Sequence, residues 1–326
     1  MPYKKTLSFL IKIGIVFFSF YFIYNELVSN NNLDTIEYKD LLDVIKGNYL
    51  IILCVIFLMI MNWLVEAFKW RFMISKIEKV SIATSLRAVF SGITVSSFTP
   101  NRIGEYAGRV FCLEKGNRIQ AVLITILGSM AQLLTTVVFG SIAFYILREP
   151  LIKEIAIIVN FEFSSIYFFL LFIINLLFIL IFFNVSTLVN SLVKFRFFYF
   201  LKKYINIISM FSLRDLTKVL SLSILRYIIF SSQFLILLNL FNVEIGLYES
   251  IFSVMLVFFF ITIPPKIPLA EIGVRGSVAL FVFGLFSASD HYGILSSTFI
   301  LWIINLIIPA IIGSVFIFSL KFFRKS

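Results

Sequence analysis

Long apolar runs separated by shorter polar segments dominate the pattern along this chain. A helix needs about 20 apolar residues to cross a bilayer core of about 30 Å, and six runs approach that length. We predict full spans at 7–24, 49–68, 118–147, 164–183, 215–241 and 292–320. No small-residue cleavage site follows the first run, so we expect it to be retained as a span rather than removed as a signal peptide.

Two further apolar regions, 81–114 and 250–285, are interrupted by proline, glycine and charged residues. Within the first, residues 101–113 would extend only about 20 Å as a helix at 1.5 Å per residue, which is too short to cross. We therefore expect each region to form a re-entrant helical hairpin, which enters the membrane and returns to the side it came from.

The composition agrees with this pattern, because 60% of the 326 residues are hydrophobic and 14% are charged, with a mean hydropathy of +1.04. Soluble domains carry about 25% charged residues, so a soluble protein is excluded. The net charge of +11 fits a positive-inside bias and contact with anionic lipid better than nucleic-acid binding. Cys54, Cys112 and His291 form neither a metal-ligand spacing nor a nucleophile–base pair, so we expect no cofactor, no metal site and no enzyme.

Lysine and arginine set the expected orientation, because cytoplasmic loops carry an excess of both. With the N-terminus and the C-terminus in the cytoplasm, the basic segments all fall inside, provided that each interrupted region returns. These segments are 69–79, 115–118, 194–218 and 321–325. Residues 194–211 mix bases with aromatics and are expected to form an interfacial helix. We expect a multi-pass protein of the cell membrane, that is, the inner or plasma membrane.

The order of span, hairpin and span occurs twice in opposite orientation, in residues 49–147 and 215–320. The span 164–183 connects the two repeats, and residues 1–48 supply the first span and an outside loop. We therefore expect one integral membrane domain, all α-helical, built as an inverted repeat. Inverted repeats with broken helices are typical of transporters, whose site lies at the repeat interface.

The two hairpin tips read TPNRIGEYAGR at 99–109 and PPKIPLAEIGVRG at 264–276. In each, a proline break precedes a glutamate with an arginine four residues later, the favourable order for an ion pair on a helix. A glutamate early in a helix also complements the helix dipole. We expect the tips to break or hinge at Pro100, Gly104, Pro264, Pro265, Pro268 and Gly273.

Charged residues inside apolar segments provide the candidate site, because each costs about 2.5–3.5 kcal/mol on insertion scales unless it is paired or faces a cavity. The candidates are Glu66, Arg102, Glu105, Arg109, Arg226, Glu271 and Arg275. Internal ion pairs are one explanation: Glu105 with Arg109, Glu271 with Arg275, and Glu66 with Arg71 or a hairpin arginine. The excess of arginine favours an anionic ligand, above all phosphate, which the guanidinium fork binds in bidentate fashion.

Three segments resemble a known family: P-x-R-I-G-E-Y-x-x-R at 100–109, AEIGVRG at 270–276 and EAFKWRFMI at 66–74. They are similar to the flippase-like membrane region of lysylphosphatidylglycerol synthases. The resemblance implies a role in moving aminoacylated or otherwise modified lipids between leaflets. The synthases add a soluble aminoacyl-transferase domain after this region. Because the chain ends at Ser326, we expect a stand-alone member that does not lysylate lipids.

Together these observations predict a translocator of a lipid or lipid-linked headgroup. The phosphate of a phospholipid or a polyprenyl-phosphate-linked lipid would dock on the four candidate arginines, and the two hairpins would alternate as gates. A lipid-modifying enzyme is the expected kind of protein partner. Three alternatives stay open: a transporter of a small water-soluble anion, an intramembrane enzyme that uses Glu66, Glu105 or Glu271 as acid or base, and a scaffold for envelope enzymes.

Overall fold

The computed structural model describes residues 38–159, 165–192, 206–264, 271–286 and 290–318, with a few isolated positions outside these ranges. Within them the chain is helical apart from turns and short connections, and no strand is present. The elements are α2 (Tyr38–Gly47), α3 (Tyr49–Ile74), α4 (Ile82–Ser96), η2 (Pro100–Arg102), α5 (Gly104–Val110), α6 (Arg118–Ile146), α7 (Arg148–Val159), α8 (Ser165–Phe183), α9 (Val185–Leu192), η4 (Ile208–Met210), α11 (Leu213–Leu240), α12 (Leu247–Thr262), α13 (Glu271–Gly284), α14 (His291–Trp302), η6 (Ile303–Ile307) and α15 (Ile308–Ile317).

Five helices of the described part of the chain are long and apolar enough to cross a membrane. They are α3, α6, α8, α11 and the continuous unit of α14, η6 and α15, and they correspond to five of the six predicted spans. The sixth, predicted at 7–24, lies largely outside the described residues, as does most of the interfacial helix predicted at 194–211. The protein is therefore a helical membrane protein with several spans.

Polar side chains mark where these helices begin. Ser81 accepts the Thr84 backbone N–H at 3.1 Å before α4, and Asn117 accepts the Ile119 N–H at 3.0 Å before α6. Before α11, Ser212 and Asp215 form a reciprocal capping box. Each cap satisfies an N–H group that has no partner within its own helix.

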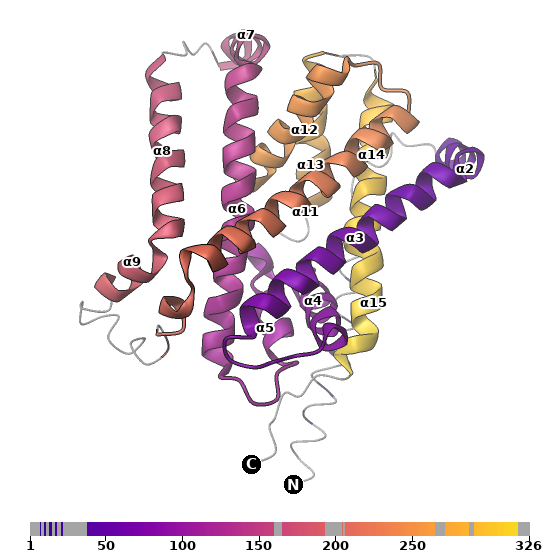
Figure 1. Cartoon of the computed structure of the whole chain (residues 1–326). Helices are drawn as coiled ribbons and strands as arrows, with labels where there is room; N and C mark the ends of the chain where they lie inside the picture. Colours follow the sequence, from indigo (N-terminus) through magenta and orange to yellow (C-terminus); the bar gives the residue numbers. More distant parts are fainter. Residues whose placement is uncertain are drawn as a thin grey trace.

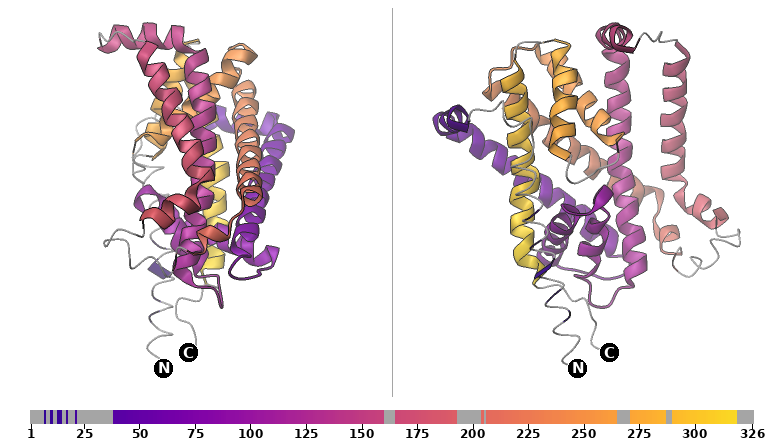
Figure 2. Two further views of the ribbon diagram at one scale, coloured as in Figure 1. Left: turned by 60° about the vertical axis from the view of Figure 1, so that its left-hand side comes forward. Right: turned by 180° about the vertical axis from the view of Figure 1, so that it is seen from behind.

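Two pairs of shorter helices, α4 with α5 and α12 with α13, lie toward opposite ends of the molecule (Figures 1 and 2). Between them α3 packs against α11, and both cross the molecule obliquely (Figure 1). Each pair also packs against a long helix of the other half of the chain, since α4 contacts α15 and α12 contacts α6. The contacts of the two halves therefore correspond helix by helix.

Glycine makes the same kind of crossing in both halves. A Cβ atom at Gly313 of α15 would lie 2.1 Å from the Phe90 carbonyl oxygen of α4. A Cβ atom at Gly140 of α6 would lie 2.2 Å from the Phe259 Cβ of α12. Only glycine allows these backbones to approach so closely, which is how apolar helices pack tightly in a membrane.

A carboxylate ties the two ends of each helix pair together. Glu78, before α4, accepts the backbone N–H groups of Glu114, Lys115 and Gly116, which follow α5, at 2.6–3.1 Å. In the other half Asp290, after α13, accepts the Glu244 N–H before α12 at 3.1 Å. In both pairs the chain therefore leaves close to the point at which it entered.

Candidate functional site

The break between α4 and α5 is organised by Thr99 and Pro100. The Thr99 hydroxyl donates to the Val95 carbonyl at 3.1 Å and accepts the Gly104 N–H at 2.9 Å, which closes the turn. Pro100 begins η2. A backbone N–H at this position would have no partner within the helix, so the N–H that proline lacks is not missed. Asn101 and Arg102 both adopt left-handed backbone angles, with φ of 51° and 57°. Such angles are unusual for an arginine and often mark functional positions.

Glycine brings α5 into backbone contact with α4. A Cβ atom at Gly108 would lie 2.7 Å from the Gly92 Cα, and one at Gly104 would lie 2.5 Å from the Val95 carbonyl oxygen. On α5, Glu105 lies in the first turn and Arg109 in the last turn. The predicted break at Pro100 and Gly104 therefore lies where the sequence pattern puts it.

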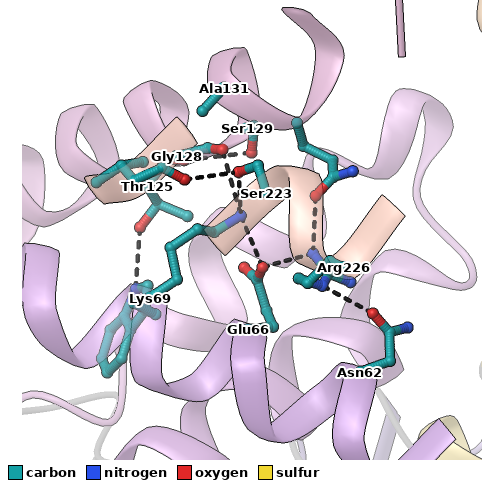
Figure 3. Close-up of polar contacts among 12 residues, drawn as sticks. Asn62, Glu66, Lys69, Thr125, Gly128, Ser129, Ala131, Ser223 and Arg226 are labelled. Carbon is teal, nitrogen blue, oxygen red and sulfur yellow. Dashed lines mark hydrogen bonds and ion pairs between the residues drawn. The ribbon is translucent and has the colours of Figure 1, made fainter. Parts of the chain in front are cut away.

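Glu66 of α3 is the centre of a buried ion cluster and is only 4% exposed. Its Oε1 accepts from Arg109 Nη1 of α5 at 2.7 Å, and its Oε2 accepts from Arg226 Nη1 of α11. Oε2 also lies 2.8 Å from Lys69 Nζ, one turn further along α3. Figure 3 shows Glu66 between Lys69 and Arg226. One carboxylate thus joins three elements, and its burial is offset by three cations.

Lys69 is a member of this cluster that the sequence pattern missed. The predicted second span ends at residue 68, which left Lys69 among the cytoplasmic bases. That placement is wrong, because α3 continues to Ile74 and Lys69 is only 2% exposed. Its Nζ also donates to Ser223 Oγ at 3.3 Å and to the Gly128 carbonyl at 3.5 Å. Its position three residues after a buried glutamate is the signal that could have found it.

The pairings of the other candidates are mostly those predicted. Arg109 Nη2 bonds Glu105 Oε1, and Arg275 Nη2 of α13 bonds Glu271 Oε1 at 2.7 Å. Glu66 pairs with a hairpin arginine, Arg109, as one of its two predicted options. The other option, Arg71, instead donates from Nε to the Val80 carbonyl at 3.0 Å.

The second break is described in part. Pro264 follows the end of α12, and Gly273 lies in the first turns of α13. Glu271 begins α13 as predicted. The predicted break residues Pro265 and Pro268 lie outside the described residues.

Two adjoining cavities, of about 200 and 670 Å³, lie beside the Glu66 cluster. Arg102 and Arg226 line both, together with Trp63, Gln132 and Thr136. The smaller cavity also reaches Arg275, and the larger reaches Glu66, Lys69 and Glu105. Two of the predicted substrate-binding residues line neither cavity: Arg109 is paired with Glu66, and Glu271 is paired with Arg275.

Arg226 is held on the cavity wall by several weak partners besides Glu66. Its Nε donates to Asn62 Oδ1 at 3.0 Å, and its Nη1 lies 3.5 Å from Gln132 Oε1. Its guanidinium carbon lies 5.2 Å from the centre of the Trp63 ring, within the range of a cation–π contact.

Arg102 differs from the other arginines of the site. Within the described part of the chain, no carboxylate forms an ion pair with it, and its buried Nε has no hydrogen-bond partner. The indole N–H groups of Trp63 and Trp302, which also line the smaller cavity, are likewise buried and unpartnered in this part. Such groups are costly to bury unless something accepts from them. Several residues of this lining therefore carry a buried donor without a partner.

Charge at the site is unbalanced. Among the described residues, the cluster, the cavity walls and the ion-pair partner of Arg275 together hold five cations and three anions. The cations are Lys69, Arg102, Arg109, Arg226 and Arg275, and the anions are Glu66, Glu105 and Glu271. A group that enters such a lining is favoured if it carries negative charge.

The last long helix is irregular at the same cavity. Residues Ile303–Ile307 form a π-helical turn, and Asn305 within it lines the smaller cavity. The Asn305 amide donates to the Leu301 carbonyl at 3.2 Å. Single π-helical turns occur frequently at functional sites.

A comparison with protein families assigns residues 9–313 to the membrane region of lysylphosphatidylglycerol synthase. The chain belongs to this family. The matched region of the lysylphosphatidylglycerol synthase family runs from before α2 into α15, and it contains every residue of the arginine-lined cavities. The resemblance of the three sequence segments is therefore confirmed at the level of the family. The chain has no significant match among curated proteins or among solved structures.

Proposed function

We propose that the protein is a translocator of a lipid or lipid-linked headgroup, and not an enzyme, and that it binds an anionic phosphate in the arginine-lined cavities. One observation carries the proposal. Arg102, Arg226 and Arg275 come from three separate elements and line one cavity, and Arg102 has no carboxylate partner among the described residues. Guanidinium forks match the oxygens of a phosphate in charge and geometry. A phospholipid or polyprenyl-phosphate-linked lipid would leave its chains in the bilayer.

The proposal includes two re-entrant hairpins, 81–114 and 250–285, related as an inverted repeat. The carboxylate clamps of Glu78 and Asp290 support it, because each holds the start of a helix pair beside its end. The paired glycine crossings at Gly140 and Gly313 support the relation between the halves. Sites at the interface of such repeats can be opened alternately to the two sides.

In this mechanism the headgroup enters between the hairpins, and arginine side chains replace the water molecules bound to its phosphate. Pro100, Gly104, Pro264 and Gly273 mark the breaks about which the hairpins would move as gates. With the basic segments inside, both termini lie in the cytoplasm and the protein resides in the cell membrane. A lipid-modifying enzyme would supply or consume the cargo.

Reconstitution tests the proposal. The full chain is placed in liposomes that carry fluorescent phospholipids, aminoacylated phospholipids or polyprenyl phosphates, and leaflet exchange is followed by quenching from outside. We expect exchange above that of empty liposomes for at least one cargo, with loss in Arg102→Ala. Exchange no faster than in empty liposomes across the whole panel would contradict a lipid translocator.

The same liposomes separate the alternative of a water-soluble anion, since both cargoes share the phosphate chemistry. Uptake of labelled inorganic phosphate without any lipid exchange would assign the cavity to a soluble anion. Lipid exchange that is unaffected by millimolar inorganic phosphate would assign it to the lipid headgroup.

A further inference from the structure

Glu66 faces the site in a way that the proposed binding of phosphate does not explain. It is buried, lines the larger cavity, and places a carboxylate on Arg226, one of the three arginines of the smaller cavity. A carboxylate and a phosphate present the same kind of acceptor to a guanidinium. Glu66 therefore occupies a bonding position that an incoming phosphate would use.

We propose that Glu66 is an internal counter-ion, which holds Arg226 while the site is empty and is displaced from it by the phosphate of the ligand. The inference rests on the proposed function and adds its regulation. It assigns to Glu66 a positioning role rather than a direct contact with the ligand. Exchange requires that both Glu66 and Arg226 remain satisfied after they separate.

The partners of Glu66 meet this requirement. After loss of Arg226, its carboxylate keeps Arg109 Nη1 at 2.7 Å and Lys69 Nζ at 2.8 Å. A buried carboxylate left without any cation would be strongly destabilising, and these two cations prevent that. Lys69 is only 2% exposed. Within the described chain, its ion pair is with Glu66 and with no other carboxylate.

Arg226 also keeps partners after it separates from Glu66. Asn62 Oδ1 accepts from its Nε at 3.0 Å, and the Trp63 ring lies beneath the guanidinium. These neutral partners keep Arg226 on the cavity wall but do not neutralise it. When Glu66 releases it, its positive charge is available to the ligand.

The exchange also links ligand binding to the first hairpin. Glu66 of α3 bonds both Arg109 of α5 and Arg226 of α11, so it joins the hairpin to two long helices. Breaking the bond to Arg226 leaves α5 attached to α3 alone at this point. Arrival of the phosphate therefore loosens the hairpin from α11, which is the change a gate requires.

Binding measurements on variants test the exchange. Full-length protein in a non-ionic maltoside detergent is titrated by calorimetry with inorganic phosphate and with dihexanoyl phosphatidylglycerol. Glu66→Gln removes the competing charge, so we expect it to bind at least one probe about tenfold more tightly than the wild type, the size of one charge-assisted bond. Because this change leaves buried cations unpaired, the double variant Glu66→Gln with Lys69→Met is measured beside it and is expected to show the same gain.

Asp215→Asn is the matched control. It removes a carboxylate from an ion pair with Lys76, 3.0 Å long and outside both cavity linings, and we expect wild-type affinity. If the wild type binds a probe and the folded Glu66 variants bind it equally or more weakly, the exchange is overturned and the proposed function stands. If no protein binds either probe, the exchange is overturned, and the proposed function is decided by the liposome panel.

Discussion

At the scale of single residues, the proposed binding of an anion depends most on Arg102. It lines both cavities from a left-handed turn, and no carboxylate of the described chain neutralises it. We expect Arg102→Ala to lower the rate of headgroup exchange about tenfold or more, because a hydrogen bond to a charged group contributes about 1.5–3 kcal/mol. The exchange rate of Arg102→Lys should lie between those of the wild type and Arg102→Ala, since lysine keeps the charge but not the planar fork.

Arg87 provides the control for Arg102. It belongs to α4 of the same helix pair, is exposed, and stands outside both linings. Arg87→Ala should exchange headgroups at the wild-type rate in the same liposomes. Equal rates for Arg102→Ala and Arg87→Ala would show that Arg102 is not part of the pathway.

What the sequence could predict at this scale follows from distance along the chain. The pairs Glu105–Arg109 and Glu271–Arg275 lie four residues apart, and the helical repeat alone predicts them. Glu66 and Arg226 lie 160 residues apart, and only the packing of α3 against α11 brings them together. Periodicity cannot reveal such a pair, although the apolar surroundings of each residue singled it out as a candidate.

At the scale of elements, the crossing of α4 and α5 determines where Arg102, Glu105 and Arg109 lie. A Cβ atom at Gly108 would come within 2.7 Å of the α4 backbone, so the two helices must separate to accept one. We expect Gly108→Ala to destabilise the protein by about 1–3 kcal/mol, the usual cost of overpacking, with a lower thermal midpoint in detergent and slower headgroup exchange.

Gly284 is the matched glycine, because a Cβ atom there meets nothing within 4 Å. Gly284→Ala should leave both the thermal midpoint and exchange close to the wild type. If the two alanine variants behave alike, the close contact at Gly108 is not what holds α5 against α4.

The elements themselves were largely accessible from the sequence. Proline and glycine correctly located the break in the first interrupted region, because a proline cannot donate the N–H that a continuing helix needs. Apolar length predicted the five described helices that are long enough to cross a membrane, since crossing requires about 20 apolar residues. The end of α3 was placed too early, because the polar run after residue 68 resembles a loop until the buried partners of Lys69 are known.

At the scale of the whole molecule, the proposed inverted repeat makes a claim about sides. Residues before α4 and after α5 should face one side of the membrane, and residues before α12 and after α13 should face the other. The clamps of Glu78 and Asp290 are the structural reason, since each joins the two ends of one helix pair. A single crossing by either region would place its two ends on opposite sides.

Single cysteines test this arrangement. In a chain with Cys54→Ala and Cys112→Ala, an exposed position on each flank is changed: Lys79→Cys, Lys115→Cys, Leu247→Cys or His291→Cys. A membrane-impermeant maleimide applied to intact cells should label the Leu247 and His291 variants and should label the Lys79 and Lys115 variants only after the cells are opened. The two flanks of one region could instead differ, with one labelled in intact cells and the other only after the cells are opened. That region would then cross the membrane once. The two halves would then not be inverted, and a gate formed by re-entrant hairpins would have no structural basis.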